Sequence, residues 1–121
     1  IMLGTFVLSS GYYDAYFTKA QQVRRMISER TREIFEKYDF ILMPTAPSTA
    51  FKIGDNLKDP VEMYLADIYT VQANLAGIPA ISIPLSIHPN GLPFGVQFFA
   101  DKFKEEHLLA FSQYVSEALI D

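Results

Sequence analysis

The sequence predicts an α/β fold, in which helices flank a sheet. A long segment with helical periodicity, residues 18–37, is followed closely by the continuous apolar run FILM at residues 40–43. Two further strand-like segments, residues 80–84 and 94–100, lie on either side of a turn, and a second amphipathic helix is predicted at residues 104–120. Helices alternating with short apolar strands are typical of layered α/β domains.

The helix at residues 18–37 is predicted from apolar positions that recur mostly every three or four residues, with charged residues between them. The apolar positions are Ala20, Val23, Ile27, Ile34, Phe35 and Tyr38. Ion pairs such as Arg25 with Glu29 and Glu33 with Lys37 add only a few tenths of a kcal/mol each. Burial of the apolar stripe must therefore hold this helix in place.

The run at residues 40–43 has no polar alternation and is closed by Pro44. This pattern predicts a strand covered on both faces, most simply a central strand of the sheet. Residues 45–58, which contain Pro47 and Gly54, are predicted to form a long loop. Loops of this length in compact domains usually carry function or wrap a partner.

The next segment is predicted to be helical in two pieces. Pro60 suits the first helical position, and residues 61–66 continue this short helix. A second helical stretch, residues 67–76, ends at Gly77. Asp67, at the junction of the two pieces, is a candidate N-cap for the second.

The strand at residues 80–84 is expected to end at Pro84, and Asn90-Gly91 is expected to reverse the chain. The strand at residues 94–100 then pairs with it in antiparallel fashion. The last helix, residues 104–120, begins with acidic residues that suit the positive end of the helix dipole. Its apolar face is predicted to hold Leu108, Phe111, Ser112, Val115 and Leu119.

The length and composition predict a single domain-sized unit, residues 1–121, with few charged residues to cover its surface. Half of the residues are hydrophobic and 20% are charged, the latter being low for a small domain that must cover its own surface. We interpret the chain as a fragment of a larger protein. In isolation it is expected to expose an apolar patch or to self-associate.

The charge pattern argues against direct nucleic-acid binding. The net charge is −4 and the chain has no long cluster of Lys and Arg. It contains no cysteine, which excludes disulfides and thiolate metal sites. It also lacks a long apolar run and a signal-peptide pattern, so a soluble protein of the cytoplasm or of an organelle matrix is expected.

Neither the serines nor the histidines form a convincing catalytic site or metal-binding site. Ser9 and Ser10 precede Gly11, but no lysine or histidine is placed by local sequence to activate them, so a helix-ending turn is favoured. His88 and His107 are the only histidines, and they lack the partners that a metal site needs. We therefore predict no catalytic residue and no metal ligand in this chain.

Several motifs together resemble the amidase signature family over essentially the whole chain. They are MLGT at residues 2–5, LSSGYYDAY at 8–16, MPTAP at 43–47, DPVEMYLAD at 59–67, and the segments at 74–84 and 90–99. The run GYYDAY resembles most the glutamine-hydrolysing A subunits of amidotransferases that convert Glu-tRNA(Gln) to Gln-tRNA(Gln). The resemblance implies that the chain is a C-terminal fragment of an amidase signature domain, part of an α/β/α sandwich whose mixed sheet is flanked by helices.

The resemblance also implies an activity for the parent protein. A Ser-Ser-Lys apparatus in upstream sequence would hydrolyse glutamine through an acyl-enzyme. The ammonia would pass to the B subunit, which activates Glu-tRNA(Gln) with ATP and Mg²⁺, in a complex that contacts the tRNA and also holds the C subunit. Because the catalytic residues are absent here, the chain alone is expected to be inactive. Lys104, where the family tends to place an acidic helix cap, is a departure that concerns local stability.

For Asp67 the resemblance adds a second interpretation, namely that its carboxylate holds the amino group of the substrate glutamine. An arginine that grips the glutamine carboxylate would precede Ile1. The helix cap and the contact with substrate remain open alternatives for Asp67, and one carboxylate could serve both roles. Two other functions also remain open: a plain amide hydrolase of the same family, and a non-catalytic binding or interaction domain with a covered surface.

Overall fold

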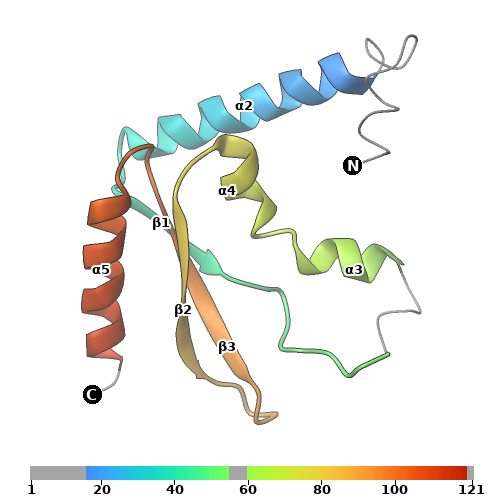
Figure 1. Ribbon diagram of the computed structural model, residues 1–121, viewed down its shortest axis with the longest axis vertical. Coiled ribbons are helices and arrows are strands. Elements are labelled where there is room, and N and C mark those ends of the chain that lie inside the picture. Colours follow the sequence, from blue (N-terminus) through green and yellow to red (C-terminus); the bar gives the residue numbers. More distant parts are fainter. Residues whose placement is uncertain (1–15, 55–59, 120–121) are drawn as a thin grey trace.

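The computed structural model describes residues 16–54 and 60–119, and a three-stranded antiparallel sheet lies at its centre (Figure 1). The strands are β1 (Phe40–Pro44), β2 (Ala80–Ile87) and β3 (Pro93–Ala100), in the order β1-β3-β2. β3 is the central strand because it pairs with both of the others. The strand at residues 40–43 is confirmed, but the central position predicted for it is wrong within the described sheet.

This difference has a simple physical origin. A continuous apolar run indicates that both faces of a strand can be buried. It does not indicate whether the strand pairs with one neighbouring strand or with two. β1 pairs only with β3 among the described strands. Its Leu42 side chain is 61% exposed.

The main apolar core lies between the sheet and α5 (Glu105–Ala118). Alternate residues of β3, namely Val96, Phe98 and Ala100, are buried on this face together with Leu108 of α5. The Phe111 ring stacks on Phe40 at 4.3 Å between centroids and meets Phe98 edge to face at 5.2 Å. The predicted apolar face of the last helix is therefore largely confirmed.

Two members of that predicted face behave differently from the rest. Ser112 is buried, and its hydroxyl has no hydrogen-bond partner within the described residues. Leu119 follows the last helical residue as the C-cap and is exposed, because the helix ends at Ala118, earlier than expected.

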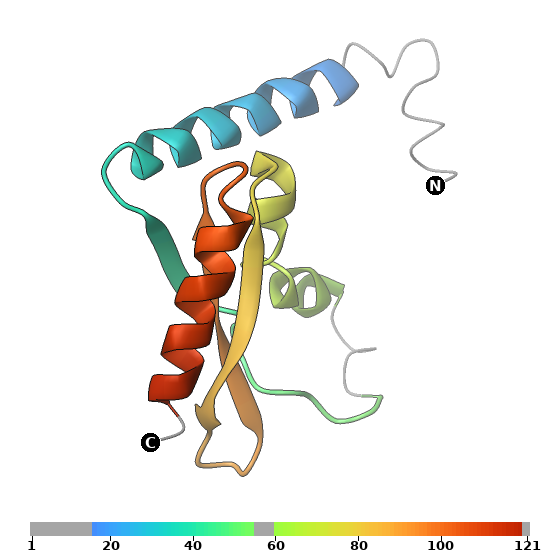
Figure 2. The same ribbon diagram turned by 60° about the vertical axis from the view of Figure 1, so that its left-hand side comes forward.

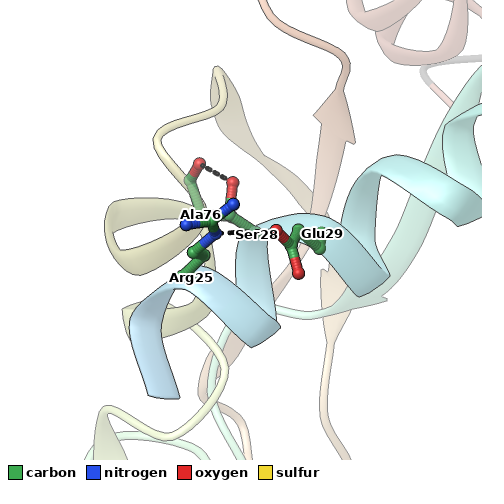
Figure 3. Close-up of polar contacts among 4 residues, drawn as sticks. All are labelled: Arg25, Ser28, Glu29 and Ala76. Carbon is green, nitrogen blue, oxygen red and sulfur yellow. Dashed lines mark hydrogen bonds and ion pairs between the residues drawn. The ribbon is translucent and has the colours of Figure 1, made fainter. Parts of the chain in front are cut away.

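Helix α2 (Thr18–Phe35) packs against α4 (Val71–Ala76), and its polar side chains complete the end of α4. The Ser28 hydroxyl donates to the carbonyl of Ala76 at 3.1 Å (Figure 3), and Arg24 Nε donates to the carbonyl of Leu75 at 3.1 Å. The last carbonyls of a helix have no partner in the helix itself, so these bonds satisfy groups left open. Gly77 ends α4 with φ 70°, as predicted.

The outer face of α2 carries ion pairs. Arg25 Nε lies 2.9 Å from Glu29 Oε1 (Figure 3), and the hydrogen bond from this guanidinium holds the pKa of Glu29 below its usual value. Glu33 pairs with Arg30 at 2.8 Å, so the predicted pair of Glu33 with Lys37 is wrong. Lys37 lies beyond the C-cap Glu36, outside the helix, and it therefore lies off the helical spacing that would bring it beside Glu33.

The hairpin of β2 and β3 is confirmed, with one correction. β2 continues past Pro84 to Ile87, and the register is irregular between Pro84 and Ser86. Because β2 is an edge strand of the sheet within the described residues, the missing N–H of a proline can be accommodated with a bulge instead of ending the strand. At the predicted reversal Gly91 has φ 83°, and Asn90 Oδ1 accepts the N–H of Leu92 at 3.1 Å.

The layers are separated clearly in a second view (Figure 2). α5 lies on one side of the sheet, and α4 lies with α3 (Pro60–Ala66) on the other. The α/β class predicted from the sequence agrees with this arrangement. No helix within residues 16–54 and 60–119 is both long and apolar enough to cross a membrane.

Candidate functional site

Asp67 lies in a tight turn that joins α3 to α4. Its backbone carbonyl accepts hydrogen bonds from the N–H groups of Thr70 and Val71 at 3.1 Å each, and from the Thr70 hydroxyl at 3.1 Å. Its own N–H donates to the carbonyl of Tyr64 at 3.4 Å. The turn is thus closed around the main chain of Asp67, and the side chain is exposed.

The predicted N-cap role of Asp67 is wrong. α4 begins at Val71, its N-cap is Thr70, and no side chain caps it. An N-cap carboxylate reaches only the N–H groups two or three residues further on, and the helix begins four residues after Asp67. The Asp67 carboxylate accepts no hydrogen bond within the described part of the chain. The other interpretation, a contact with substrate, stays a prediction.

Gln97 connects this turn to the sheet. Its side chain is on the face of β3 opposite α5, because Val96 and Phe98 on either side of it face α5. Its Nε2 donates to the carbonyl of Pro44 at 3.0 Å and to the carbonyl of Tyr69 at 3.0 Å. One buried amide therefore joins the end of β1, the centre of the sheet and the turn of Asp67.

Gln97 was missed by the sequence reasoning, although the sequence carries a signal for it. It is the one polar side chain among the apolar residues of FGVQFFA at residues 94–100. A buried polar side chain costs free energy unless it is hydrogen-bonded. A glutamine inside such a strand therefore indicates specific partners, but its spacing does not reveal that they lie 53 and 28 residues away.

A cavity of about 540 Å³ lies beside the end of β1. Its wall includes the loop after β1, residues 45–50, together with Ser82, His88 and Gly95. The hydroxyls of Thr45 and Ser82 are 2.6 Å apart. No base accompanies this hydroxyl pair in the cavity wall except His88, whose Nδ1 accepts the N–H of Asn90 at 3.3 Å. The arrangement suits binding or support better than nucleophilic catalysis.

The remaining sequence candidates are not brought together. His88 lies in the hairpin, whereas His107 lies in α5 and lines a different pocket with Phe40 and Asp101. Within the described ranges, no group of three or more His, Cys, Asp or Glu could hold a metal ion. Ser9 and Ser10 lie outside the described residues. Asp67 remains the one predicted site residue that the structure describes.

Residues 1–109 match the amidase family. Since this match spans most of the chain, the chain belongs to that family.

Within this family, the chain is similar to A subunits of the glutamyl-tRNA(Gln) amidotransferase. The chain is 60% identical over 109 residues to the A subunit of the glutamyl-tRNA(Gln) amidotransferase of Brevibacillus brevis, a match that covers 90% of this chain and 22% of that protein. It is 52% identical over 119 residues to the corresponding A subunit of Pelagibacter ubique, covering 98% of this chain and 24% of that protein. The chain therefore spans about a quarter of the length of these relatives.

Solved structures share the fold. The crystal structure of the glutamyl-tRNA(Gln) amidotransferase A subunit from Thermotoga maritima matches with a TM-score of 0.76 and 53% identity, over 88% of this chain and 23% of that one. The structure of 6-aminohexanoate cyclic dimer hydrolase matches with a TM-score of 0.72 over 92% of this chain and 25% of that one. Its 22% identity makes this second likeness one of fold alone.

Proposed function

We propose that this chain is part of the glutamine-hydrolysing A subunit of an amidotransferase that converts Glu-tRNA(Gln) to Gln-tRNA(Gln). The carrying observation is the identity of 52–60% to two such proteins over nearly the whole chain. The 6-aminohexanoate cyclic dimer hydrolase, which has the same fold, shares only 22% identity. Since one fold hosts many activities, the sequence identity supports the amidotransferase over another amidase.

The division of labour in the parent complex follows from this proposal. The remainder of the A subunit supplies the Ser-Ser-Lys residues that hydrolyse glutamine. The B subunit, with ATP and Mg²⁺, activates Glu-tRNA(Gln) and takes up the ammonia, and the C subunit, the third component, completes the assembly. This chain contributes scaffold and part of the glutamine pocket, and it is inactive alone. The reaction belongs in the cytoplasm or an organelle matrix, where tRNA is charged.

Within this function we assign to Asp67 the contact with the amino group of glutamine. The amino group is cationic at neutral pH, and a carboxylate is the acceptor that forms the strongest hydrogen bond with it. The exposed side chain of Asp67 stands on a turn whose main chain is fixed by several hydrogen bonds. A rigid support of this kind suits a residue that must hold a ligand in one orientation.

The test uses the complete amidotransferase complex, with Asp67→Asn introduced into the full-length protein that contains this chain. The KM for glutamine should rise about tenfold or more, because a hydrogen bond to a charged group contributes about 1.5–3 kcal/mol. Formation of Gln-tRNA(Gln) from ammonium chloride should not change, since ammonia needs no glutamine pocket. An unchanged KM for glutamine would remove Asp67 from the pocket.

The competing function, a plain amide hydrolase, makes a different prediction for the same preparation. A plain hydrolase would act on amides without any partner protein and would form no Gln-tRNA(Gln). The amidotransferase should form Gln-tRNA(Gln) only when the A subunit, its partners, ATP and glutamine are all present. Omitting each component in turn separates the two functions.

A further inference from the structure

The side-chain amide of Gln97 has an orientation that its partners determine. Both partners, the main-chain oxygens of Pro44 and Tyr69, are carbonyls and can only accept hydrogen bonds. The NH₂ group must therefore face them, and each of its two N–H bonds is used. The side chain is 4% exposed, so water does not replace these bonds readily if they are lost.

The two carbonyls belong to different parts of the site. Pro44 is the last residue of β1, and Tyr69 lies in the turn two residues after Asp67. The other hydrogen bonds of this turn, such as Val71 N–H to Asp67 O at 3.1 Å, stay within α3, the turn and α4. Among the described residues, Gln97 is thus the side chain through which hydrogen bonds join the turn to the sheet.

We infer that Gln97 is a positioning residue for glutamine: its amide holds the turn that carries Asp67 in register with the end of β1. This inference rests on the role proposed for Asp67. The main-chain bonds of the turn fix its internal shape, whereas the bond from Gln97 fixes its place on the sheet. A carboxylate displaced by a fraction of an ångström no longer meets the ammonium group at hydrogen-bond distance.

Gln97→Met in the complete complex tests this inference, because methionine has a similar length but donates no hydrogen bond. The KM for glutamine should rise about threefold to tenfold, since a misplaced Asp67 loses at most the contact that Asp67→Asn removes. The ammonium-dependent reaction should be unchanged. Gln113→Met is the matched control, because Gln113 lies on the exposed face of α5 and, among the described residues, its amide bonds only to Glu117; it should leave the KM unchanged.

A double variant separates positioning from general damage. If Gln97 acts through Asp67, then Gln97→Met should add nothing to the KM of Asp67→Asn. Hydrogen exchange supplies a readout independent of activity: in Gln97→Met the amides of Thr70 and Val71 should exchange faster, while those of α5 stay as slow as before. If Gln97→Met does not assemble, then Gln97→Asn, which keeps the amide but is too short to reach both carbonyls, should show the same pattern.

Each alternative outcome has a distinct meaning. A raised KM in Asp67→Asn with an unchanged KM in Gln97→Met overturns the positioning role and leaves the function of Asp67 intact. If Gln97→Met lowers the rate of the ammonium-dependent reaction as much as that of the glutamine-dependent reaction, the variant has general structural damage, and this outcome also overturns the positioning role. An unchanged KM in Asp67→Asn overturns the assignment of Asp67 and the inference about Gln97 with it.

Discussion

At Gly95 the backbone of β3 comes so close to its neighbours that a side chain has no room. A Cβ there would lie 2.9 Å from the carbonyl oxygen of Ile83, 3.2 Å from Ser82 Oγ and 3.3 Å from Thr45 Oγ1. The first of these atoms belongs to the main chain of β2, which cannot move without disturbing the sheet. The glycine thus permits the approach of β1 and β2 that brings the Thr45 and Ser82 hydroxyls together.

Gly95→Ala should therefore lower the free energy of unfolding by about 1–3 kcal/mol, the usual cost of forcing extra atoms into a packed site. Urea unfolding followed by circular dichroism measures this difference. Gly91→Asn is the control: Gly91 has open space around it, and asparagine is among the side chains that best tolerate its φ of 83°, so the loss there should be smaller. Equal losses in the two variants would contradict a steric role for Gly95.

The residues of the site were predictable to different degrees. Asp67 stands out in the sequence, because its motif resembles that of a known family. Its cap role was mispredicted because the helical pattern of residues 67–76 does not reveal that the first four residues form a turn. Gln97 depends on two carbonyls from distant segments. A main-chain carbonyl has no signature in the sequence, so this connection needs the fold.

At the scale of elements, the two long helices were predicted best because their periodic patterns extend over several turns. α5 buries the apolar face that its sequence predicts, whereas Val23 and Ile34 of the α2 stripe are exposed within the described residues. The segments expected at residues 18–37 and 104–120 are found as Thr18–Phe35 and Glu105–Ala118. The strands were found, but the end of β2 was not predicted. A proline ends a central strand by removing a hydrogen bond, whereas an edge strand accommodates it, and edge position is a property of the sheet.

Helix α5 begins at a residue that does not cap it, and this gives a prediction for the element. Lys104 is the N-cap, and its side chain makes no cap hydrogen bond. Lys104→Ser should raise the free energy of unfolding by about 0.5–1 kcal/mol, because a serine hydroxyl accepts an N–H of the first helical turn. Thermal unfolding measures the gain. Lys102→Ser, in the preceding turn, removes the same charge away from the cap, and a similar gain there would contradict the capping explanation.

At the scale of the whole molecule, the described surface exposes many large apolar side chains. An apolar groove of about 530 Å³ runs between α2 and α4. Its wall includes Val23, Met26, Ile34, Ile68 and Val71, each at least 40% exposed. This agrees with the apolar exposure expected from the composition. Since the chain spans about a quarter of its relatives, other parts of a longer polypeptide could cover this groove.

The isolated chain should therefore self-associate through the α2–α4 groove, because contact between two copies removes apolar side chains from water. Sedimentation velocity should show a larger species whose share rises with concentration. Met26 is 61% exposed on this surface, and Met26→Glu should shift the chain towards the monomer, because association would bury a charge without a partner. Tyr114 is 71% exposed on α5, so Tyr114→Glu should leave the association unchanged. A chain that stays monomeric at every concentration would contradict this prediction and favour the independent binding domain, whose surface needs no further cover.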